Sequence, residues 1–468
     1  MKGEYPRAGD KGMTIRFLLV AATYKREVIE VGFPPLGLAY IASSLREAFG
    51  EVFTFRVIDG NLEEQIKLFQ PHIVGISSTT KNYGIAKEHA RKAKEYNLPV
   101  VIGGVHISFM PQNLTEDMDV GVSFEGEITI VDLMRSFLAN GRFNKAGLYN
   151  INGLIFRDNG ELVITKPREF IQSLDTVSFP ARDLLEVKES TSMLTSRGCP
   201  HRCAFCSTSR LWGNRIRYAS AEYVAEEIEL IYKKYGSKLI TIYDDMFTFN
   251  SRRIKDILSE FKKKSAFGKV RFQCNIRTDV LTEEIAEIFH EMNVEAVGLG
   301  MESGSQKIID YLKTGGITVG DNAKAIAILR KYHIIPYCSF ILGSPPDDKE
   351  AIAQTLKFIK DNRINNLDFH VLTPYPGTPV WDYAKEQGLV NDNMDWSILN
   401  MQGGPTPQSI IFSGKLSREE VISAFQYMEN RKEKYQRRVN MLIAFKRPRI
   451  VVDTFKTVFK EVARKLRG

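Results

Sequence analysis

Three of the five cysteines in this chain fall within eight positions, and their spacing restricts what the surrounding segment can fold around. Cys199, Cys203 and Cys206 stand in the string TSRGCPHRCAFCSTS, with three residues in the first interval and two in the second. The count is odd, the cysteines are clustered, and none precedes Cys199. In a chain without an export signal, this pattern indicates metal ligation and not disulfide bonding.

The cysteine string follows a predicted strand, so we expect all three thiolates on one short loop. Three thiolates can ligate three irons of a [4Fe–4S] cluster, and the fourth iron then stays open to a substrate or a cofactor. The alternative is a structural zinc site, which needs a fourth ligand such as His201, Cys274 or Cys338. The spacing lacks the second C-x2-C pair typical of such sites. Cys274 and Cys338 lie inside strand patterns, where we expect buried core thiols.

The rest of the chain alternates apolar runs with amphipathic stretches, which predicts an α/β fold. The runs TIRFLLVAA and HIVGISS predict strands and PLGLAYIASSLREAFG predicts a helix, so the first part should form a parallel sheet with helices on both faces. From Ser192, six longer β–α units predict a partial barrel whose chemistry lies at the carboxyl ends of its strands. The predicted domains are a first domain (13–140), a β-hairpin connector (141–191) with its turn at Asp158-Asn159-Gly160, a barrel (192–390) and a helical carboxyl-terminal region (391–468).

Composition and charge limit the binding partners and the cellular compartment that the sequence predicts. The 468 residues carry a net charge of +8, an excess too mild over this length to predict nucleic-acid binding. No window approaches about 18 consecutive apolar residues, so no membrane-spanning helix is expected. The start MKGEYPRAGDKGM has no apolar signal run, and we therefore expect a cytoplasmic protein.

The carboxyl-terminal tail predicts a basic amphipathic helix. From Met441 onward it holds eight Lys or Arg side chains and two acidic ones, with apolar residues on one face. Such a helix either packs its apolar face on the barrel or lies on the inner face of the membrane as a peripheral contact. The second interpretation would favour a lipid-like substrate.

The cysteine string also carries a family resemblance. CPHRCAFC matches the CxxxCxΦC signature of the radical S-adenosylmethionine (SAM) superfamily, with Phe205 as the aromatic residue. Five strand-end segments follow in the order in which that family places its SAM contacts: YDDMFTFN, IRTD, GLGMESGSQ, FILGSPPDD and LTPYPGTP. Residues 190–390 thus resemble the family's barrel. The resemblance implies that Cys199, Cys203 and Cys206 bind a [4Fe–4S] cluster whose open iron is chelated by SAM.

The resemblance also implies a set of SAM contacts. Phe205 and Gly343 would lie at the adenine, Asp244 and Asp245 at the methionine amine, Arg277 at the carboxylate, and Glu302 and Ser303 at the ribose hydroxyls. Tyr243-Asp244-Asp245 stands where the family usually has a glycine-rich turn. The alternatives are structural: either aspartate could cap the next helix, Arg277 could pair with Asp279 on the surface, and Gly343 could serve only a turn. No protein acid or base is assigned, because the SAM-derived radical performs the chemistry.

Residues 15–140 resemble the cobalamin-binding domain that precedes the barrel in one large subgroup of this family. PPLGLAYIASSLRE, GISSTT, GGVHISF and SFEGEITI carry the resemblance. It implies that the nucleotide tail of the corrinoid contacts Ser77, Ser78, Thr79, Gly103 and Gly104, and that Leu36 and Gly37 lie near the corrin face. The motif D-x-H-x-x-G is absent, so no histidine is assigned to cobalt, and His106 is expected to make loop contacts. The alternative is a flavodoxin-like domain that binds no corrinoid.

The order of these parts resembles the cobalamin-dependent radical SAM enzymes, which include class B methyltransferases and the anaerobic magnesium-protoporphyrin IX monomethyl ester cyclase. The resemblance implies a flavodoxin-like (Rossmann-type) cobalamin domain, a partial (β/α)6 TIM-type barrel and a helical tail. It further implies cleavage of SAM to a 5′-deoxyadenosyl radical, hydrogen abstraction from an unactivated C–H bond, and methyl transfer from methylcobalamin.

Two other functions fit the same parts. The first is an oxidative cyclase or C–C bond-forming enzyme that works without methyl transfer on a tetrapyrrole or a lipid. The second is a non-catalytic corrinoid or cluster sensor. For an enzyme, we expect a small-molecule or lipid-like substrate and an external one-electron donor such as flavodoxin or ferredoxin. Methylthiotransferases of the superfamily carry three extra cysteines before the barrel, and this chain has none there.

Overall fold

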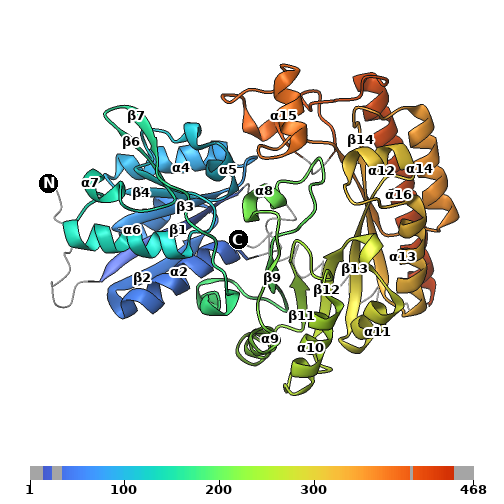
Figure 1. Ribbon diagram of the computed structural model, residues 1–468, viewed down its shortest axis with the longest axis horizontal. Coiled ribbons are helices and arrows are strands. Elements are labelled where there is room, and N and C mark those ends of the chain that lie inside the picture. The colour runs from blue at the N-terminus through green and yellow to red at the C-terminus, as the bar shows by residue number, and fades with distance from the viewer. Residues whose placement is uncertain (1–13, 24–33, 401–403, 447–468) are drawn as a thin grey trace.

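The computed structural model describes residues 14–23, 34–400 and 404–446, with only the backbone described for 434–446. Two α/β units lie side by side, and the last helix, α16 (Arg418–Lys446), runs along the outer side of the second unit (Figure 1). Each unit is built on a largely or wholly parallel sheet. The predicted α/β fold with two sheets is therefore confirmed.

The first sheet has seven strands in the order β2-β1-β3-β4-β5-β6-β7. They are β1 (Ile15–Ala22), β2 (Phe53–Ile58), β3 (Ile73–Ser78), β4 (Val100–Gly103), β5 (Val120–Val122), β6 (Leu154–Asp158) and β7 (Glu161–Ile164). Strands β1 to β5 run parallel, and β6 and β7 add to the edge in antiparallel fashion. Sequence reasoning missed β5, whose three residues are too few to show a period.

Helices cover both faces of the first sheet. They are α2 (Leu36–Phe49), α3 (Leu62–Phe69), α4 (Tyr83–Glu95), α5 (Val105–Phe109) and α6 (Glu127–Asn140). Along β1, Leu18 and Val20 join the core under α3 and α4, whereas Phe17 and Leu19 join the core under α2 and α6. Successive side chains of a strand point to opposite faces, so one strand supplies both cores.

The predicted hairpin forms, but it does not connect two domains. Asn159 and Gly160 occupy the turn with φ of +47° and +84°, a conformation that asparagine and glycine tolerate. Strand β6 pairs with β5 and β7 pairs with β6, so residues 154–164 belong to the first sheet. Within the predicted connector 141–191, the hairpin therefore extends the first sheet, and the link to the second unit begins after Ile164. Only the pairing partner, which lies far away in sequence, decides this.

The second sheet has six parallel strands in the order β8-β11-β12-β13-β14-β15. They are β8 (Ser190–Met193), β11 (Leu239–Ile242), β12 (Arg271–Ile276), β13 (Val294–Glu302), β14 (Ile335–Leu342) and β15 (Leu367–Val371). Within the described residues β8 and β15 do not pair, so the sheet is open, as a partial barrel must be. The helices between and after these strands are α9 (Ala221–Tyr235), α10 (Ser251–Lys262), α11 (Glu283–Glu291), α12 (Gln306–Leu312), α13 (Val319–Lys331), α14 (Lys349–Asp361), α15 (Pro379–Glu386) and α16 (Arg418–Lys446).

Local sequence signals set the ends of these helices. Ser220 caps α9 by accepting a hydrogen bond from the Tyr223 amide, and Gly236 ends the helix with φ of +71°. Thr318 and Asp321 form a reciprocal capping box at the start of α13. These contacts satisfy amides that have no partner within the helix.

The strand expected in front of the cysteines is divided in two. Strand β8 ends at Met193, and β9 (Ser196–Arg197) leaves the sheet to pair with β10 (Arg217–Tyr218) in a two-stranded ribbon. The run SMLTSRG is continuous in composition, so its sequence gives no sign of this break. The cysteine loop therefore follows the ribbon and not the sheet.

The chain after β15 joins the two units through a shared apolar core. Trp381, Trp396 and Phe412 pack with side chains of the first domain. His106 of α5 is fully buried there, with its ring stacked 4.0 Å from that of Tyr83 and edge-on to Trp396. Burial lowers the pKa of His106 to about 3. His106 is thus a neutral packing residue between the domains.

The segment that links the two units contains a buried ion pair. Arg182 Nη2 lies 2.6 Å from Glu227 Oε1 on α9, and both side chains are at most 1% exposed. Arg182 also donates to Thr191 Oγ1 at 3.2 Å, next to the start of the second sheet. Removing one member of such a pair leaves an uncompensated buried charge.

We expect Arg182→Met to lower the free energy of unfolding by about 3–5 kcal/mol, because Glu227 would remain buried without its partner. Denaturant unfolding of the full chain measures the loss. The matched control is Lys331→Met, which breaks an exposed pair with Glu283 and should produce no measurable loss. Equal losses in the two variants would contradict the assignment.

No helix in the described part of the chain is long and apolar enough to cross a membrane. The basic amphipathic helix predicted from Met441 onward falls on residues whose side chains or placement lie outside the described residues.

Candidate active site

One aspartate closes the cysteine loop at both ends. Asp245, which follows β11, accepts a hydrogen bond from the Gly198 amide at 3.0 Å and another from Thr208 Oγ1 at 3.1 Å. Gly198 and Thr208 flank the segment that holds Cys199, Cys203 and Cys206. Gly198 has φ of +102°, and a Cβ there would lie 2.1 Å from the Arg215 carbonyl oxygen, so only glycine fits.

The middle of the loop is held by the last residue of α12 and by the segment that follows it. The Ala204 amide donates to the Leu312 carbonyl at 2.8 Å, and the Arg202 amide donates to Thr314 Oγ1 at 3.1 Å. The Ala204 carbonyl accepts from the Val380 amide at 3.1 Å. Hydrogen bonds to other segments therefore hold the loop at its middle as well as at its ends.

The chemistry of the three thiols fits a cluster. Burial raises the pKa of the Cys199 thiol to about 11 and also raises that of Cys206. When a metal binds, buried thiols of this kind lose their protons to the solvent and ligate the metal as thiolates. Within the described residues, no three His, Cys, Asp or Glu side chains converge on a point that could hold one metal ion. A cluster does not need such a point, because each thiolate binds its own iron.

The zinc alternative fails on its fourth ligand. Cys274 is 2% exposed and Cys338 fully buried, and both lie in the hydrophobic core of the second sheet. They are the core thiols that the strand patterns predict. Neither Cys274, Cys338 nor His201 joins the three loop cysteines in a group able to hold one ion.

Asp244 is occupied by the segment that leads into the loop. Its carboxylate accepts from the Thr195 amide at 2.6 Å, from Thr195 Oγ1 at 2.5 Å and from Ser196 Oγ at 2.6 Å. Burial raises the pKa of Asp244. The helix that follows is capped by Asn250, so neither aspartate serves as the cap that the structural alternative required. Asp244 orders the turn between β8 and β9.

Arg277 lies against the cluster loop. It is 8% exposed, and its Nη1 lies 3.7 Å from Cys203 Sγ. Nε and Nη2 donate to the two carboxylate oxygens of Asp279 at 3.1 and 3.0 Å, and Nη2 also reaches the Thr314 carbonyl at 3.0 Å. The pairing with Asp279 therefore exists, with Arg277 buried beside a cysteine and Asp279 reaching the surface. The guanidinium of Arg277 is thus in direct contact with one of the three loop cysteines.

Glu302 ends β13 in a strained conformation. Its φ is +58°, unusual for a residue with a side chain, and it is 5% exposed. Lys313 Nζ lies 3.1 Å from Glu302 Oε1 and donates to the Gly300 carbonyl at 2.5 Å. Sequence reasoning missed Lys313, since nothing in its own segment points to β13. Glu302 and Lys313 thus form a buried ion pair at the carboxyl end of the sheet.

The other three predicted SAM contacts, Ser303, Gly343 and Phe205, lie against other parts of the protein. Ser303 Oγ lies 2.9 Å from Thr355 Oγ1 and accepts from the Ser305 amide at 3.1 Å. Gly343 has φ of +79°, as the turn alternative requires, and a Cβ there would lie 3.4 Å from Val421 of α16. Phe205 is half-buried and packs on the core shared by the two domains.

A cavity of about 270 Å³ lies over the first sheet. Four of the predicted corrinoid contacts line it: Gly37, Ser77, Gly103 and Gly104. The other three do not. Leu36 packs with Ile171 and Val177, Ser78 is buried beneath Gly104, and Thr79 is exposed to solvent. Sequence spacing identifies the strand end, whereas the direction of each side chain there depends on the fold.

Glycines and apolar side chains make the walls of this cavity. Gly75 and Gly126 line it together with Leu38, Ile76 and Val122. No atom lies within 4 Å of where a Cβ on Gly37 would stand, and at Gly103 the nearest atom would be the Val122 carbonyl oxygen at 3.6 Å. A ligand could therefore approach the backbone at these two glycines. The residues fit a bulky, partly apolar group such as the nucleotide tail of a corrinoid.

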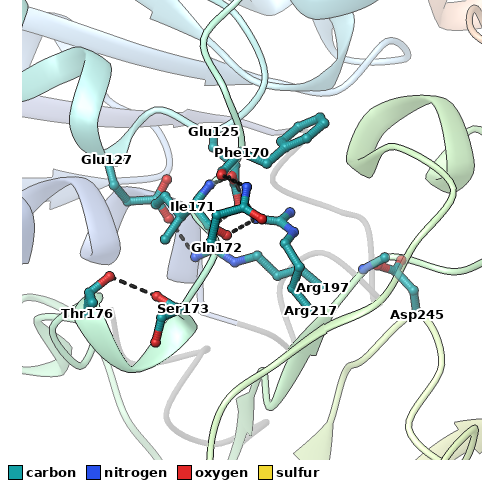
Figure 2. A network of polar contacts seen from close by, with 11 residues as sticks. Glu125, Glu127, Phe170, Ile171, Gln172, Ser173, Thr176, Arg197, Arg217 and Asp245 are labelled. Atoms are coloured by element: carbon teal, nitrogen blue, oxygen red, sulfur yellow. Dashed lines mark hydrogen bonds and ion pairs between the residues drawn. The ribbon is translucent and has the colours of Figure 1, made fainter.

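Glu125, Glu127 and Arg197 also line the cavity and belong to a buried network of charges between the two domains (Figure 2). Arg197 Nη1 donates to Glu125 Oε1 at 2.7 Å, and Arg197 Nη2 donates to Glu127 Oε1 at 2.6 Å. Arg217 Nη1 donates to Glu125 at 2.8 Å and to the Ile171 carbonyl at 2.7 Å. All four side chains are at most 10% exposed. Sequence reasoning missed these residues, because the two halves lie about seventy positions apart.

Comparison with known proteins identifies the family. Residues 193–359 match the model of the radical SAM superfamily, and residues 26–134 match that of the B12 binding domain. The uncharacterized methyltransferase PH0819 of Pyrococcus horikoshii is 34% identical over 391 residues, which cover 79% of this chain and 82% of that protein. The chain belongs to the radical SAM superfamily. Its B12-binding domain precedes the radical SAM domain, as the resemblance implied.

Two further proteins are similar to this chain. The anaerobic magnesium-protoporphyrin IX monomethyl ester cyclase of Cereibacter sphaeroides is 26% identical over 409 residues, covering 82% of this chain and 66% of the cyclase. The methyltransferase TsrM from Kitasatospora setae, solved with cobalamin and a [4Fe–4S] cluster, has the same fold with a TM-score of 0.69 and 20% identity, covering 80% of this chain and 78% of TsrM.

The protein is therefore a methyltransferase-like, cobalamin-dependent radical SAM enzyme, whose cofactors are a [4Fe–4S] cluster, SAM and cobalamin. The sensor alternative is set aside. Enzymes of this superfamily take electrons from an external donor and act on small molecules.

We expect Asp245→Ala to weaken cluster binding about 10- to 100-fold, because both hydrogen bonds that close the loop are lost. Iron and sulfide retained by the reconstituted chain during a chelator challenge measure the effect. Asp245→Asn keeps an acceptor oxygen and should lose less. Asp361→Ala, on the exposed face of α14, is the matched control. Unchanged cluster retention in Asp245→Ala would contradict the role of this residue.

A second prediction concerns the cavity over the first sheet. Gly37 lies on α2 with no atom within 4 Å of the position of a Cβ, so Gly37→Leu should fill the cavity without strain. We expect loss of hydroxocobalamin binding in equilibrium dialysis and no loss of stability, since leucine favours a helix more than glycine does. Gly84→Leu, at an equally open position on α4 outside the cavity, is the control. Undiminished binding by Gly37→Leu would show that the corrinoid binds elsewhere.

Proposed function

We propose that this enzyme transfers a methyl group to an unactivated carbon of a small-molecule substrate. The observation that carries the proposal is the position of the cluster loop relative to the corrinoid cavity. Arg197 and Trp212 line that cavity and also flank the segment that holds all three loop cysteines. A radical formed at the loop and a methyl donor in the cavity would then act in one enclosed space.

The bound cofactors supply a 5′-deoxyadenosyl radical, which removes hydrogen from the substrate carbon, and a methyl group from the corrinoid. In our proposal Cys199, Cys203 and Cys206 hold the cluster. Arg277, whose Nη1 lies 3.7 Å from Cys203 Sγ, is the proposed partner of the SAM carboxylate.

Two carboxylates are the proposed remaining SAM contacts. Glu302, held by Lys313, is the proposed partner of the ribose hydroxyls. Asp245, the exposed member of the aspartate pair, is the proposed partner of the methionine amine in addition to closing the cluster loop. Phe205 is proposed to lie at the adenine. Asp244, Ser303 and Gly343 have partners within the protein, and in our proposal they shape the strand ends without touching SAM.

The corrinoid is proposed to bind against Gly37, Ser77, Gly103 and Gly104. Its tail would lie on the backbone of β3 and β4, between α2 and α6. Leu36, Ser78 and Thr79 are not included, because they do not line the cavity.

A second candidate function is supported by the 26% identity to the Cereibacter sphaeroides cyclase. An oxidative cyclisation or C–C bond formation would use the same radical step without methyl transfer. For either reaction we propose flavodoxin or ferredoxin as the electron donor. A lipid-like substrate and peripheral contact with the inner face of the membrane depend on the basic tail from Met441.

Product analysis separates the two functions. The full chain is reconstituted anaerobically with iron, sulfide and hydroxocobalamin, and should hold about four irons and one corrinoid per chain. After reduction with dithionite and addition of SAM, we expect 5′-deoxyadenosine together with S-adenosylhomocysteine. 5′-Deoxyadenosine without S-adenosylhomocysteine would favour the cyclase.

The control is the triple variant Cys199→Ser, Cys203→Ser and Cys206→Ser. We expect it to lose the iron and to form no 5′-deoxyadenosine, since serine does not replace thiolate as a ligand for this cluster. Iron content and nucleoside formation equal to those of the unmodified chain would overturn the proposed function. Cys274→Ser, in the core, should keep both.

A further inference from the structure

The cluster loop is suspended between two side chains that belong to the wall of the corrinoid cavity. Arg197 precedes Cys199 by two positions, and Trp212 ends the short helix α8 (Thr208–Trp212) that begins two positions after Cys206. Both side chains line the cavity over the first sheet. Every loop cysteine therefore lies on a stretch of chain whose two ends touch the cavity.

The first end is fixed by charge. Arg197 is 6% exposed and donates to Glu125 and Glu127 of the first domain at 2.7 and 2.6 Å. The residue that follows it, Gly198, donates its amide to Asp245. A displacement of Arg197 would therefore be transmitted to the loop through one intervening residue.

The second end is fixed by ring contacts. The guanidinium carbon of Arg197 lies 5.6 Å from the centre of the Trp212 ring and 5.4 Å from that of Tyr40 on α2. That of Arg217 lies 5.8 Å from the same Trp212 ring. Arg197 is thus placed between an aromatic ring of each domain, and Trp212 closes the loop segment back onto its own beginning.

We propose that Arg197 and Trp212 complete the corrinoid site from the side of the radical SAM domain and couple its occupancy to the order of the cluster loop. This inference depends on the proposed position of the corrinoid. A corrinoid in the cavity restrains both ends of the loop, so the ordering cost of assembling the cluster falls. By linkage, an assembled cluster strengthens corrinoid binding by the same factor.

The experiment compares hydroxocobalamin affinity in two forms of the full chain. Equilibrium dialysis is carried out on the chain with its reconstituted cluster and on the chain freed of cluster by a chelator. We expect the dissociation constant of the cluster-containing form to be at least about five-fold lower. The reciprocal measurement is the rate of iron loss to a chelator, which hydroxocobalamin should slow.

Trp212→Leu and Arg197→Met should bring the ratio of the two dissociation constants close to one. Arg197 belongs to a buried network, so Arg197→Met could fail to fold, and Trp212→Leu then provides the test by itself. The matched control is Arg210→Gln, also on α8, whose exposed side chain pairs with Asp382 and does not line the cavity. It should keep the ratio of the unmodified chain.

Three results would overturn the inferred coupling between the corrinoid and the cluster loop. Equal affinity in the two forms of the unmodified chain would overturn the coupling while leaving corrinoid binding intact. A ratio retained in Trp212→Leu would remove this residue from the coupling and overturn the inference. Absence of hydroxocobalamin binding in both forms would overturn both the inference and the corrinoid part of the proposed function.

Discussion

The buried charges between the two domains are the contact on which the rest of the site depends. Glu125 and Glu127 stand at the start of α6 in the first domain, and Arg197 and Arg217 stand on the β9–β10 ribbon of the second. Bringing such groups out of water is costly, and a buried pair gains little over an apolar contact. What it does provide is geometry, because each guanidinium must meet its carboxylate in one orientation. The network thereby fixes the corrinoid cavity relative to the cluster loop.

Side chains at the strand ends of the second sheet likewise fix the geometry of the site. Asp245 holds both ends of the cysteine loop, the segment after α12 holds its middle, and Arg277 reaches a cysteine while anchored by Asp279. Few of these residues are free to react. The protein's contribution is to hold, orient and enclose cofactors that carry the chemistry themselves. This arrangement suits a fold whose relatives include both a methyltransferase and a cyclase.

The candidate site could be predicted where a residue type is itself the signal. The spacing of Cys199, Cys203 and Cys206 predicts an iron–sulfur cluster, and the strand-end glycines Gly103 and Gly104 predict a surface that a ligand can approach closely. At other strand ends, the predicted contact residues also have partners within the protein. Asp244 and Ser303 stand at the expected strand ends, yet their oxygens are taken by Thr195, Ser196 and Thr355. Lys313, Arg197 and Trp212 were missed, since each acts through a partner remote in sequence.

The sequence by itself determined the two α/β domains, the cluster loop and the family, because hydrophobic period and cysteine spacing are local properties of the chain. Only the tertiary structure decided that the hairpin at Asn159-Gly160 extends the first sheet, that β9 leaves the second, and that Arg197 joins the two domains. Pairing partners of this kind are set by which surfaces meet after folding. The residue pattern of one segment does not specify which distant segment it will contact in the folded protein.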